Sequence, residues 1–331
     1  MDKFTQFIGI DISKEYFDAS ILIDNTKFTH NQFSNTKKGV TAFLKWIKAE
    51  GCSVDSTLIC MEHTGIYKNI LVDVLLSKSY NLWVEMAYRI IRSSGIQRGK
   101  NDKVDSERIA LYAKKNQEDV LLFQSSSDLL TKIQALLGQR EMNIAHKAAI
   151  EVRTQELKDY DDKSYKLLYK NDQSILKAYH QAIQSIDIQL EELIRQDQEI
   201  SQMYDSIESV KGVGRITAMY LICYTNAFTS FESPRQLASY SGVVPFEYTS
   251  GRSIRGKAKV HFMANKRLKK LLHLCALSSS RFDPEMKSYY EKKIEQGKHK
   301  MLVLNNIRNK LIHRICACVR NKTIYQTRQV A

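Results

Sequence analysis

Four acidic residues in the first third of the chain stand where carboxylates are unusual. Asp11 closes an apolar run at residues 7–10, and Glu62 closes another at residues 58–61. A carboxylate at the end of a buried strand is costly unless a cation lies beside it. Asp102 and Asp105 are three residues apart, so they share one face at the start of a predicted helix. Hard divalent cations take carboxylate oxygens as ligands, so the four residues predict a site for Mg²⁺ or Mn²⁺.

Each of these acids could instead be a local capping or turn residue. That alternative suits Asp102 and Asp105, because acids are common in the first turn of a helix. It is poor for Asp11 and Glu62, which follow strands. Sites that hold two cations and stabilise phosphoryl transfer need several carboxylates from different elements, and this set meets that need in kind and placement.

Positive charge is concentrated at the other end of the chain. The 331 residues carry a formal net charge of +14. Residues 208–331 hold 23 Lys and Arg but only 7 Asp and Glu, so the whole excess lies there. A segment this basic indicates a polyanionic partner, and the phosphates of a nucleic acid are the expected one.

The elements that must position the acids lie in residues 1–120. Apolar runs at 6–12, 16–23 and 28–33 predict three consecutive strands. They are followed by an expected helix at 38–49, strand at 57–62, helix at 66–79, strand at 81–86 and helix at 103–115. This order is that of a ribonuclease-H-like α/β fold. In that order Asp11 and Glu62 end neighbouring strands, so both can face one crevice.

Residues 121–207 have a different pattern. Residues 126–207 contain no proline, and Gly138 is their one glycine. Apolar residues recur at spacings of three and four with charges between them. The pattern predicts two or three long helices, as an antiparallel hairpin or coiled coil that links domains or forms a dimer contact. A helical insertion packed on its own domain is an open alternative.

Residues 208–331 are predicted to form a helical, basic domain. Its first motif, VKGVGRITA at 210–218, is typical of a helix-hairpin-helix. In such a motif Lys211, Gly212 and Gly214 would present backbone N–H groups to a DNA phosphate. A tight connection between two helices is the plainer interpretation of the same glycines.

A glycine-rich segment at 242–256 is predicted to be a loop. Ser250 is followed by Gly251, and Arg252 and Arg255 are suited to binding phosphate. A serine held in such a loop could act as a nucleophile. Composition alone favours an ordinary loop serine, and Ser253 would be equally eligible.

A further basic segment spans residues 257–273. Leucines at 268, 271, 272 and 274 are expected to face inward. The opposite face would lie on a phosphate backbone and carries four cations: Lys266, Arg267, Lys269 and Lys270. A solvated basic helix face is the alternative.

The remaining features predict a cytoplasmic protein without a membrane partner. Six cysteines show no C-x-x-C spacing, so they are expected to be reduced thiols. No signal peptide and no apolar run long enough to span a bilayer is evident.

The chain resembles transposases of the bridge-recombinase insertion-sequence family, which are related to the Piv-type DNA invertases. The resemblance runs from about residue 6 to residue 320. It rests on the blocks GIDISK (9–14), EHTGIY (62–67), KNDKVDSERIA (100–110), VKGVGRITA (210–218), FESPRQLASYSGVVPFEYTSGRSIRG (231–256) and NKRLKKLL (265–272).

The resemblance implies a function and partners. It places metal binding on the acidic tetrad Asp11, Glu62, Asp102 and Asp105, and the nucleophile on Ser250. It implies a RuvC-like catalytic domain at 1–120, a coiled-coil segment at 121–207 and a serine-bearing helical domain at 208–331. It also implies DNA substrates (the element ends and the target), a structured non-coding guide RNA, and a homo-oligomer that is a dimer, becoming a tetramer in the synaptic complex.

Three other functions share part of this residue pattern. A metal-dependent RuvC-like nuclease or junction resolvase would use the same acids with water as nucleophile and would not need Ser250. A non-enzymatic nucleic-acid-binding protein would not need intact acids. An actin-like ATPase shares the strand-end Asp11, but it needs two nucleotide-binding halves that a basic helical C-terminus does not supply.

Overall fold

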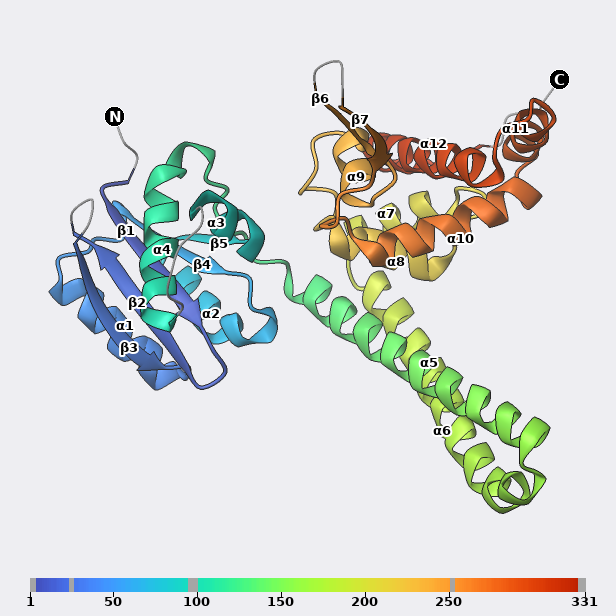
Figure 1. Cartoon of the computed structure of the whole chain (residues 1–331), viewed down its shortest axis with the longest axis horizontal. Coiled ribbons are helices and arrows are strands. Elements are labelled where there is room, and N and C mark those ends of the chain that lie inside the picture. Colours follow the sequence, from blue (N-terminus) through green and yellow to red (C-terminus); the bar gives the residue numbers. More distant parts are fainter. Residues whose placement is uncertain (1–3, 24–26, 95–100, 251–253, 327–331) are drawn as a thin grey trace. The chain divides into compact units, whose positions relative to one another are not determined.

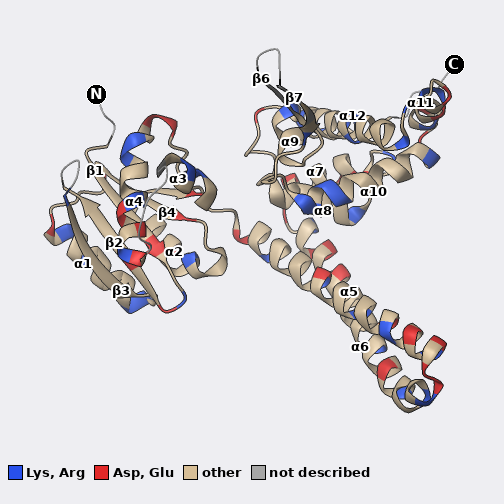
Figure 2. Ribbon diagram, viewed as in Figure 1, with Lys and Arg blue, Asp and Glu red and all other residues tan. Residues whose placement is uncertain are grey.

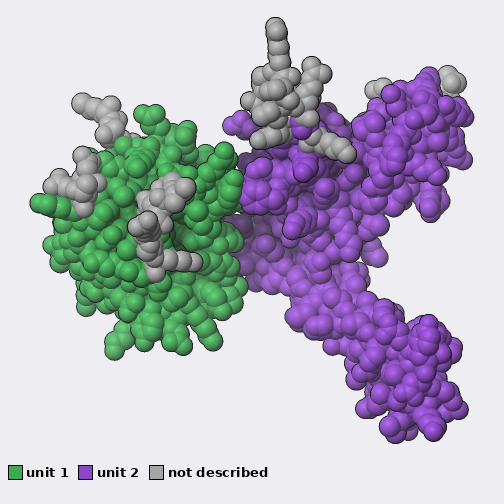
Figure 3. All heavy atoms as spheres, viewed as in Figure 1, with its two compact units in different colours: residues 1–125 green, residues 126–331 purple. Residues whose placement is uncertain are grey.

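The structure, a computed structural model, describes residues 4–23, 27–94, 101–250 and 254–326. It consists of two compact units, residues 1–125 and 126–331, each of which is described by itself (Figure 3). Within the described ranges no helix is long and apolar enough to cross a membrane.

The first unit is built on a five-stranded sheet of order β3-β2-β1-β4-β5. Its strands are β1 (Gln6–Ile12), β2 (Tyr16–Leu22), β3 (Phe28–Ser34), β4 (Thr57–Glu62) and β5 (Asn81–Glu85). The first three are antiparallel, whereas β4 is parallel to β1 and β5 to β4. Strands β1 and β4 are almost wholly buried and mostly apolar, as expected for central strands that are covered on both faces.

Helices cover both faces of this sheet (Figure 1). On one face α1 (Lys37–Ala49) and α2 (Asn69–Ser77) pack on an apolar cluster that includes Ile8, Ile10 and Phe43. On the other face α4 (Asp102–Lys115) packs on Phe7, Leu58 and Cys60. A Cβ on Gly9 would lie 2.1 Å from the Ser106 carbonyl oxygen, so α4 can approach β1 closely only because residue 9 is glycine.

The predicted elements of this unit are largely confirmed. All five strands lie within a residue or two of the expected positions, and the order agrees with a RuvC-like arrangement. The helix expected at 66–79 begins as a 3-10 turn, Gly65–Lys68, before α2. Two short elements were not predicted: α3 (Ala87–Ser94) and a 3-10 turn at Gln117–Asp119.

The second unit begins with two long antiparallel helices, α5 (Asp128–Tyr160) and α6 (Asp162–Arg195). Ser127 and Asp161 cap them, each accepting a hydrogen bond from the backbone N–H of the third helical residue. Near the turn between the helices, Asp172 pairs with Arg153 and accepts from Thr154. The predicted long helices are therefore confirmed, and they form a hairpin.

Six further helices form the core of this unit. They are α7 (Gln198–Glu208), α8 (Arg215–Tyr224), α9 (Pro234–Tyr240), α10 (Lys266–Phe282), α11 (Pro284–Glu295) and α12 (Lys300–Asn321). Their shared apolar cluster extends to the near end of the α5–α6 hairpin, where Ile186, Leu190 and Ile194 recur at the spacing of one helical turn.

Two expectations for this unit were wrong. The segment 242–256 is not simply a loop, because its described residues include β6 (Phe246–Ser250), which pairs antiparallel with β7 (Ile254–Lys259). Aromatic and β-branched residues such as Phe246 and Ile254 favour this hairpin. Leu274 does not face inward and is 52% exposed, while Cys275 takes the buried position in α10. A helix that buries residues 268, 271 and 272 reaches the same face again at 275.

Candidate metal centre and nucleic-acid interface

The strand register brings the first two predicted acids to one face of the sheet. Asp11 lies near the end of β1, and Glu62 is the last residue of β4. Gly9 pairs with Cys60 and Ile10 with Met61, so the next position places Asp11 beside Glu62. Paired residues point to the same side of a sheet, and Gly9, two residues before Asp11, touches α4. Both acids therefore lie on the face that α4 covers.

Helix α4 supplies the other two acids from its first turn. Its N-cap is Asn101, whose side-chain oxygen accepts a hydrogen bond from the Val104 N–H at 2.8 Å. Asp102 is exposed and Asp105 is half-buried. The Asp105 carboxylate accepts a hydrogen bond from the Arg108 guanidinium at 2.7 Å. The helix start thus carries negative charge toward the carboxyl ends of β1 and β4.

The electrostatics of Asp11 show that these groups are within reach of one another. Burial and the charges of neighbouring carboxylates raise the pKa of Asp11 to about 6. The neighbours are, in order of effect, Asp102, Asp105, Glu62 and Asp18. A cation placed among them would favour the ionised form and offset this repulsion.

The acids are gathered but do not form a finished metal cage. Among the described residues, no group of three or more His, Cys, Asp or Glu side chains is arranged to hold a metal ion. Asp105 is already engaged by Arg108. The four predicted ligands are all carboxylates, which suit a hard divalent cation. Such a cation would also offset their excess negative charge. The residues therefore fit Mg²⁺ or Mn²⁺ in chemistry and charge.

Two buried carboxylates on the same face were not predicted from the sequence. Asp18 pairs in register with Asp11 and accepts hydrogen bonds from His30 at 2.7 Å and Gln32 at 3.0 Å. The signal in the sequence was the spacing of Asp18 and Ser20. These polar residues are two positions apart and so lie on the same face of a strand.

The second missed carboxylate, Glu85, pairs in register with Glu62. It accepts hydrogen bonds from the Met86 N–H at 2.8 Å and the Tyr112 hydroxyl at 3.1 Å, and Arg89 lies 3.4 Å away. Glu85 ends a parallel strand as Glu62 does, so the same rule would have found it. Its contacts tie β5 to α3 and α4.

The predicted nucleophile, Ser250, lies on the β6–β7 hairpin. Ser250 is the last residue of β6 and pairs with Ile254, while Arg255 pairs with Thr249. Only the backbone of Ser250 and Arg255 is described. Arg252 and Ser253 lie outside the described residues. The roles assigned to these side chains stay predictions.

The glycines of the Gly-x-Gly turn before α8 were predicted to bind phosphate, and at Gly212 close packing also requires a glycine. Gly212 has φ of +93°, and a Cβ there would lie 2.7 Å from the Ser279 backbone nitrogen of α10. Gly214 is the N-cap of α8, with no side-chain hydrogen bond and open space around it. Lys211 is exposed, and its carbonyl accepts a hydrogen bond from the Ser279 hydroxyl.

The basic side chains of helix α10 differ in their exposure to solvent. Lys266 and Lys270 are exposed, and Lys269 is half-buried. Figure 2 shows basic residues along α10. Arg267 instead pairs with Glu141 of α5 at 2.8 Å and lies 5.0 Å from the centre of the Tyr220 ring. Its described contacts are therefore internal to the unit.

An exposed aromatic group beside the hairpin was also missed. Phe246 begins β6, and His261 and Phe262 follow β7. The His261 and Phe262 ring centres are 4.6 Å apart, and Phe246 is 6.2 Å from His261. Exposed rings beside lysines are suited to stacking on nucleic-acid bases. Their separation in sequence hid the group.

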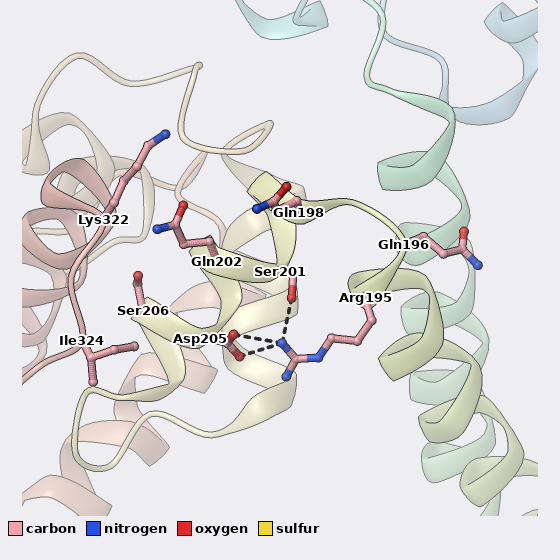
Figure 4. A pocket seen from close by; sticks show the side chains of 9 residues that line it. All are labelled: Arg195, Gln196, Gln198, Ser201, Gln202, Asp205, Ser206, Lys322 and Ile324. Carbon is pink, nitrogen blue, oxygen red and sulfur yellow. Dashed lines mark hydrogen bonds and ion pairs between the residues drawn. The ribbon is translucent and has the colours of Figure 1, made fainter.

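A hollow of about 610 Å³ lies elsewhere in this unit, between α6, α7 and the segment after α12 (Figure 4). Arg195 reaches across it to Asp205 at 2.8 Å and to the Ser201 hydroxyl at 2.7 Å. None of the predicted site residues lines it. The ion pair ties the end of α6 to α7, which indicates a structural role.

The first unit thus has an acidic edge, which is the group Asp11, Glu62, Asp102 and Asp105 at the carboxyl ends of β1 and β4. Comparison with known proteins agrees with the combination of this acidic edge and a basic helical unit. A family model described as "Transposase", of the DEDD IS110 type, matches residues 8–158. A second, described as "Transposase IS116/IS110/IS902 family", matches residues 204–291.

Individual relatives are similar over different lengths. The chain is 29% identical to the "Pilin gene-inverting protein" of Moraxella lacunata over 327 residues, which is 97% of this chain and 98% of the relative. The Moraxella bovis protein of the same name matches equally well. An "Insertion element IS110 uncharacterized 43.6 kDa protein" of Streptomyces coelicolor is 30% identical over 158 residues, 48% of this chain and 38% of that protein.

Proposed function

Because the chain belongs to the IS116/IS110/IS902 family of transposases, we propose that it is the recombinase of an insertion element. Members of this family cut and rejoin DNA, and the full-length relatives named for gene inversion fit the same chemistry. The proposal for this chain is excision and insertion of its element through a covalent serine–DNA intermediate, assisted by Mg²⁺ or Mn²⁺.

The observation that carries the proposal is the gathering of carboxylates from β1, β4 and the first turn of α4, which is reflected in the raised pKa of Asp11. Three carboxylates from other parts of the fold, Glu62, Asp102 and Asp105, act on it together with burial. A stable fold that crowds like charges in this way loses free energy unless a cation is part of the working state. The four residues would hold the metal, and a bound divalent cation would stabilise charge on the attacking and leaving oxygens of a phosphoryl transfer.

The chemistry assigned to the chain's own residues is a two-step exchange. The Ser250 hydroxyl gives up its proton, and its oxygen forms a bond to a DNA phosphorus while one P–O bond of the backbone breaks. The released DNA oxygen takes a proton. In the second step a hydroxyl of another DNA end attacks the phosphoserine and frees Ser250. The number of phosphodiester bonds is conserved, so the exchange needs no ATP.

The second unit is proposed to hold the nucleic acid. Its charge excess lies in residues 208–331, and α10 presents Lys266, Lys269 and Lys270. The turn Lys211–Gly214 is proposed to act as a helix-hairpin-helix that binds a phosphate, together with Arg252 and Arg255 of the hairpin.

The resemblance supports four further proposals. Residues 1–120 act as the RuvC-like catalytic domain, 121–207 as a coiled-coil dimerisation segment and 208–331 as the serine-bearing domain. A structured guide RNA selects target and donor. The working complex is a dimer that becomes a tetramer on synapsis, with the acids of one subunit serving the serine of another. The reaction takes place in the cytoplasm.

The test is to trap a denaturant-resistant protein–DNA adduct in cells that carry the element and its flanking non-coding ends. Wild type is compared with Ser250→Ala, Ser253→Ala and Asp11→Ala. We expect the adduct in wild type and in Ser253→Ala alone, with the modified peptide containing Ser250. DNA cutting that survives Ser250→Ala without an adduct would instead support a hydrolytic RuvC-like nuclease with water as nucleophile.

A further inference from the structure

One arginine of the second unit is buried without a counter-charge. The half-buried arginines there each pair with a carboxylate: Arg140 with Asp187, Arg267 with Glu141, and Arg314 with Asp283 and Glu285. Arg308 of α12 is only 6% exposed, yet it forms no hydrogen bond or ion pair with any described residue. Its Nε is enclosed and has no partner. A buried unpaired charge is strongly unfavourable, so its presence points to a partner that the folded chain does not supply.

The neighbours of Arg308 place it at the base of the β6–β7 hairpin. Three residues earlier on α12, Asn305 donates a hydrogen bond to the Val243 carbonyl at 2.9 Å. One turn later, Ile312 packs in a cluster with Val243 and Leu272. Residues 305, 308 and 312 share one helix face, so Arg308 lies toward the turn Ser241–Val243 and toward α10. That turn leads directly into β6.

Helix α10 contributes two more basic side chains to the same place. His273 follows Leu272, and burial together with the charge of Arg308 lowers the pKa of His273. Its Nδ1 is also buried without a hydrogen-bond partner. Lys269 is one turn earlier on the same face, and its Cδ lies 3.3 Å from where a Cβ on Gly242 would be. Gly242 also lies close to Val260, the residue that follows β7.

A third unsatisfied atom belongs to the turn itself. The Ser241 hydroxyl is fully buried and has no hydrogen-bond partner among the described residues. Ser241 Oγ, His273 Nδ1 and Arg308 Nε are thus three buried polar atoms around one turn. Native folds leave few such atoms unpaired, so a group of three calls for an explanation. Each of these groups, like Lys269, can donate a hydrogen bond, and none is acidic, which suits an anion.

We infer that Arg308, with His273, Lys269 and Ser241 around it, forms an anion site at the base of the β6–β7 hairpin that receives a phosphate of the DNA strand being exchanged. Arg308 acts there as a positioning residue. The inference rests on the proposed function, because it assigns the phosphate to the strand on which Ser250 acts. DNA is the favoured source since the turn Ser241–Val243 leads into the strand that ends at Ser250.

The test compares Arg308→Met with Arg320→Met in the full-length protein. Arg320 is an exposed arginine on the same helix, so its substitution makes the same charge change without the buried site. Melting temperature and the affinity for a labelled DNA duplex of the element end are measured, the latter from about 50 to 200 mM salt. Removing a buried unpaired charge should leave the melting temperature unchanged or raise it.

For DNA binding, Arg308→Met should weaken affinity by about tenfold or more at the lower salt, and reduce the slope of log affinity against log salt by about one. Arg320→Met should change neither quantity as much. Arg308→Gln, which keeps a polar head, should show the same loss of affinity and covers the case in which the Met variant folds poorly.

Three outcomes would overturn the inference. The first is a lower melting temperature in both Arg308 variants with an unchanged salt slope, which would make Arg308 a structural residue. The second is unchanged affinity and slope in both variants. The third is a loss confined to binding of the element's RNA transcript. Adduct formation by wild type and its loss in Ser250→Ala are scored separately, so failure of the proposed chemistry is distinguished from failure of this site.

Discussion

The sheet edge of the first unit and the helical core of the second treat buried charge in opposite ways. Near the carboxyl ends of β1 and β4, Asp11 lies among carboxylates that, together with burial, raise its pKa. In the helical core most partly buried arginines carry their own carboxylate, as Arg267 does with Glu141, and Arg308 is the exception. One unit is short of positive charge and the other holds a positive charge without a partner. The proposed metal-assisted reaction on a DNA phosphate would use both.

The difference also shows how each site is positioned. The acids are placed by strand register and by one close helix contact at Gly9, so they move together with the sheet. The basic residues are on helices and on a hairpin, where single side chains can be changed with less effect on the others. Substitutions at the acids should therefore affect catalysis as a group, whereas those in the second unit should separate binding from folding.

The largest expected effect is at the acidic edge. Asp11→Asn should lower DNA cutting by at least about 10³-fold, because it removes a ligand and the charge that binds the metal. Asp73→Asn, an exposed acid on α2 behind the opposite face, is the matched control and should keep near-normal cutting. The rate of strand cutting on an element-end substrate is the measurement. Equal rates in the two variants would remove the acidic edge from the reaction.

Mixing inactive subunits tests whether the two regions cooperate between chains. A mixture of Asp11→Asn and Ser250→Ala should recover cutting to a readily measured fraction of wild type, since one subunit supplies the acids and another the serine. Each variant alone should show none. Cutting is followed on the same substrate after the proteins are refolded or co-expressed together. Recovery that never rises above either single variant would mean that each chain works with its own acids and serine.

The glycines before α8 separate packing from phosphate binding. Gly212→Ala should lower the free energy of unfolding by about 2–4 kcal/mol, because φ is positive and the added Cβ meets the backbone of α10. Gly214→Ala, with open space and negative φ, should change it by less than about 1 kcal/mol. Urea unfolding measures both. Similar values for the two variants would contradict the close approach of α10 to Gly212.

The smallest effect concerns pH. The raised pKa of Asp11 means that the metal-free folded protein binds a proton more readily than the unfolded chain does. Its contribution to stability is therefore present at low pH and is lost as pH rises through about 6. Asp11→Asn should be more stable than wild type at pH 7 and should lose most of this advantage by pH 4.5. Urea unfolding in EDTA at both pH values is the check, and a pH-independent difference would contradict the crowding of charge.

The sequence predicted the parts of the site that follow from strong local patterns. Apolar runs located β1 and β4, so the strand-end positions of Asp11 and Glu62 could be read directly. The start of α4 was predicted within one residue, from the helix-start acids Asp102 and Asp105, whereas its N-cap, Asn101, was not. These predictions depend on residues close in sequence, which is why they hold.

Pairings between distant residues could not be predicted. Asp18 joins the acidic face through its register with Asp11, and a strand pattern alone does not give register to one residue. In the sequence Arg267 looks like the exposed lysines around it. Its ion pair with Glu141 depends on the packing of α5 against α10. The unpaired state of Arg308 likewise depends on three segments packing together. The hairpin at 246–259 was taken for a loop because its glycines outweighed its alternating aromatic and β-branched residues.

The most direct test of the account is Mn²⁺ binding at the acidic edge. Electron paramagnetic resonance of the free ion is used to titrate the purified full-length protein, with wild type, Asp11→Asn and Asp73→Asn in parallel. The account predicts that the tightest-binding Mn²⁺ is present in wild type and Asp73→Asn, is lost in Asp11→Asn, and is displaced by excess Mg²⁺. Superimposable binding curves for all three proteins would contradict it, because the crowded carboxylates would then serve some purpose other than holding a divalent cation.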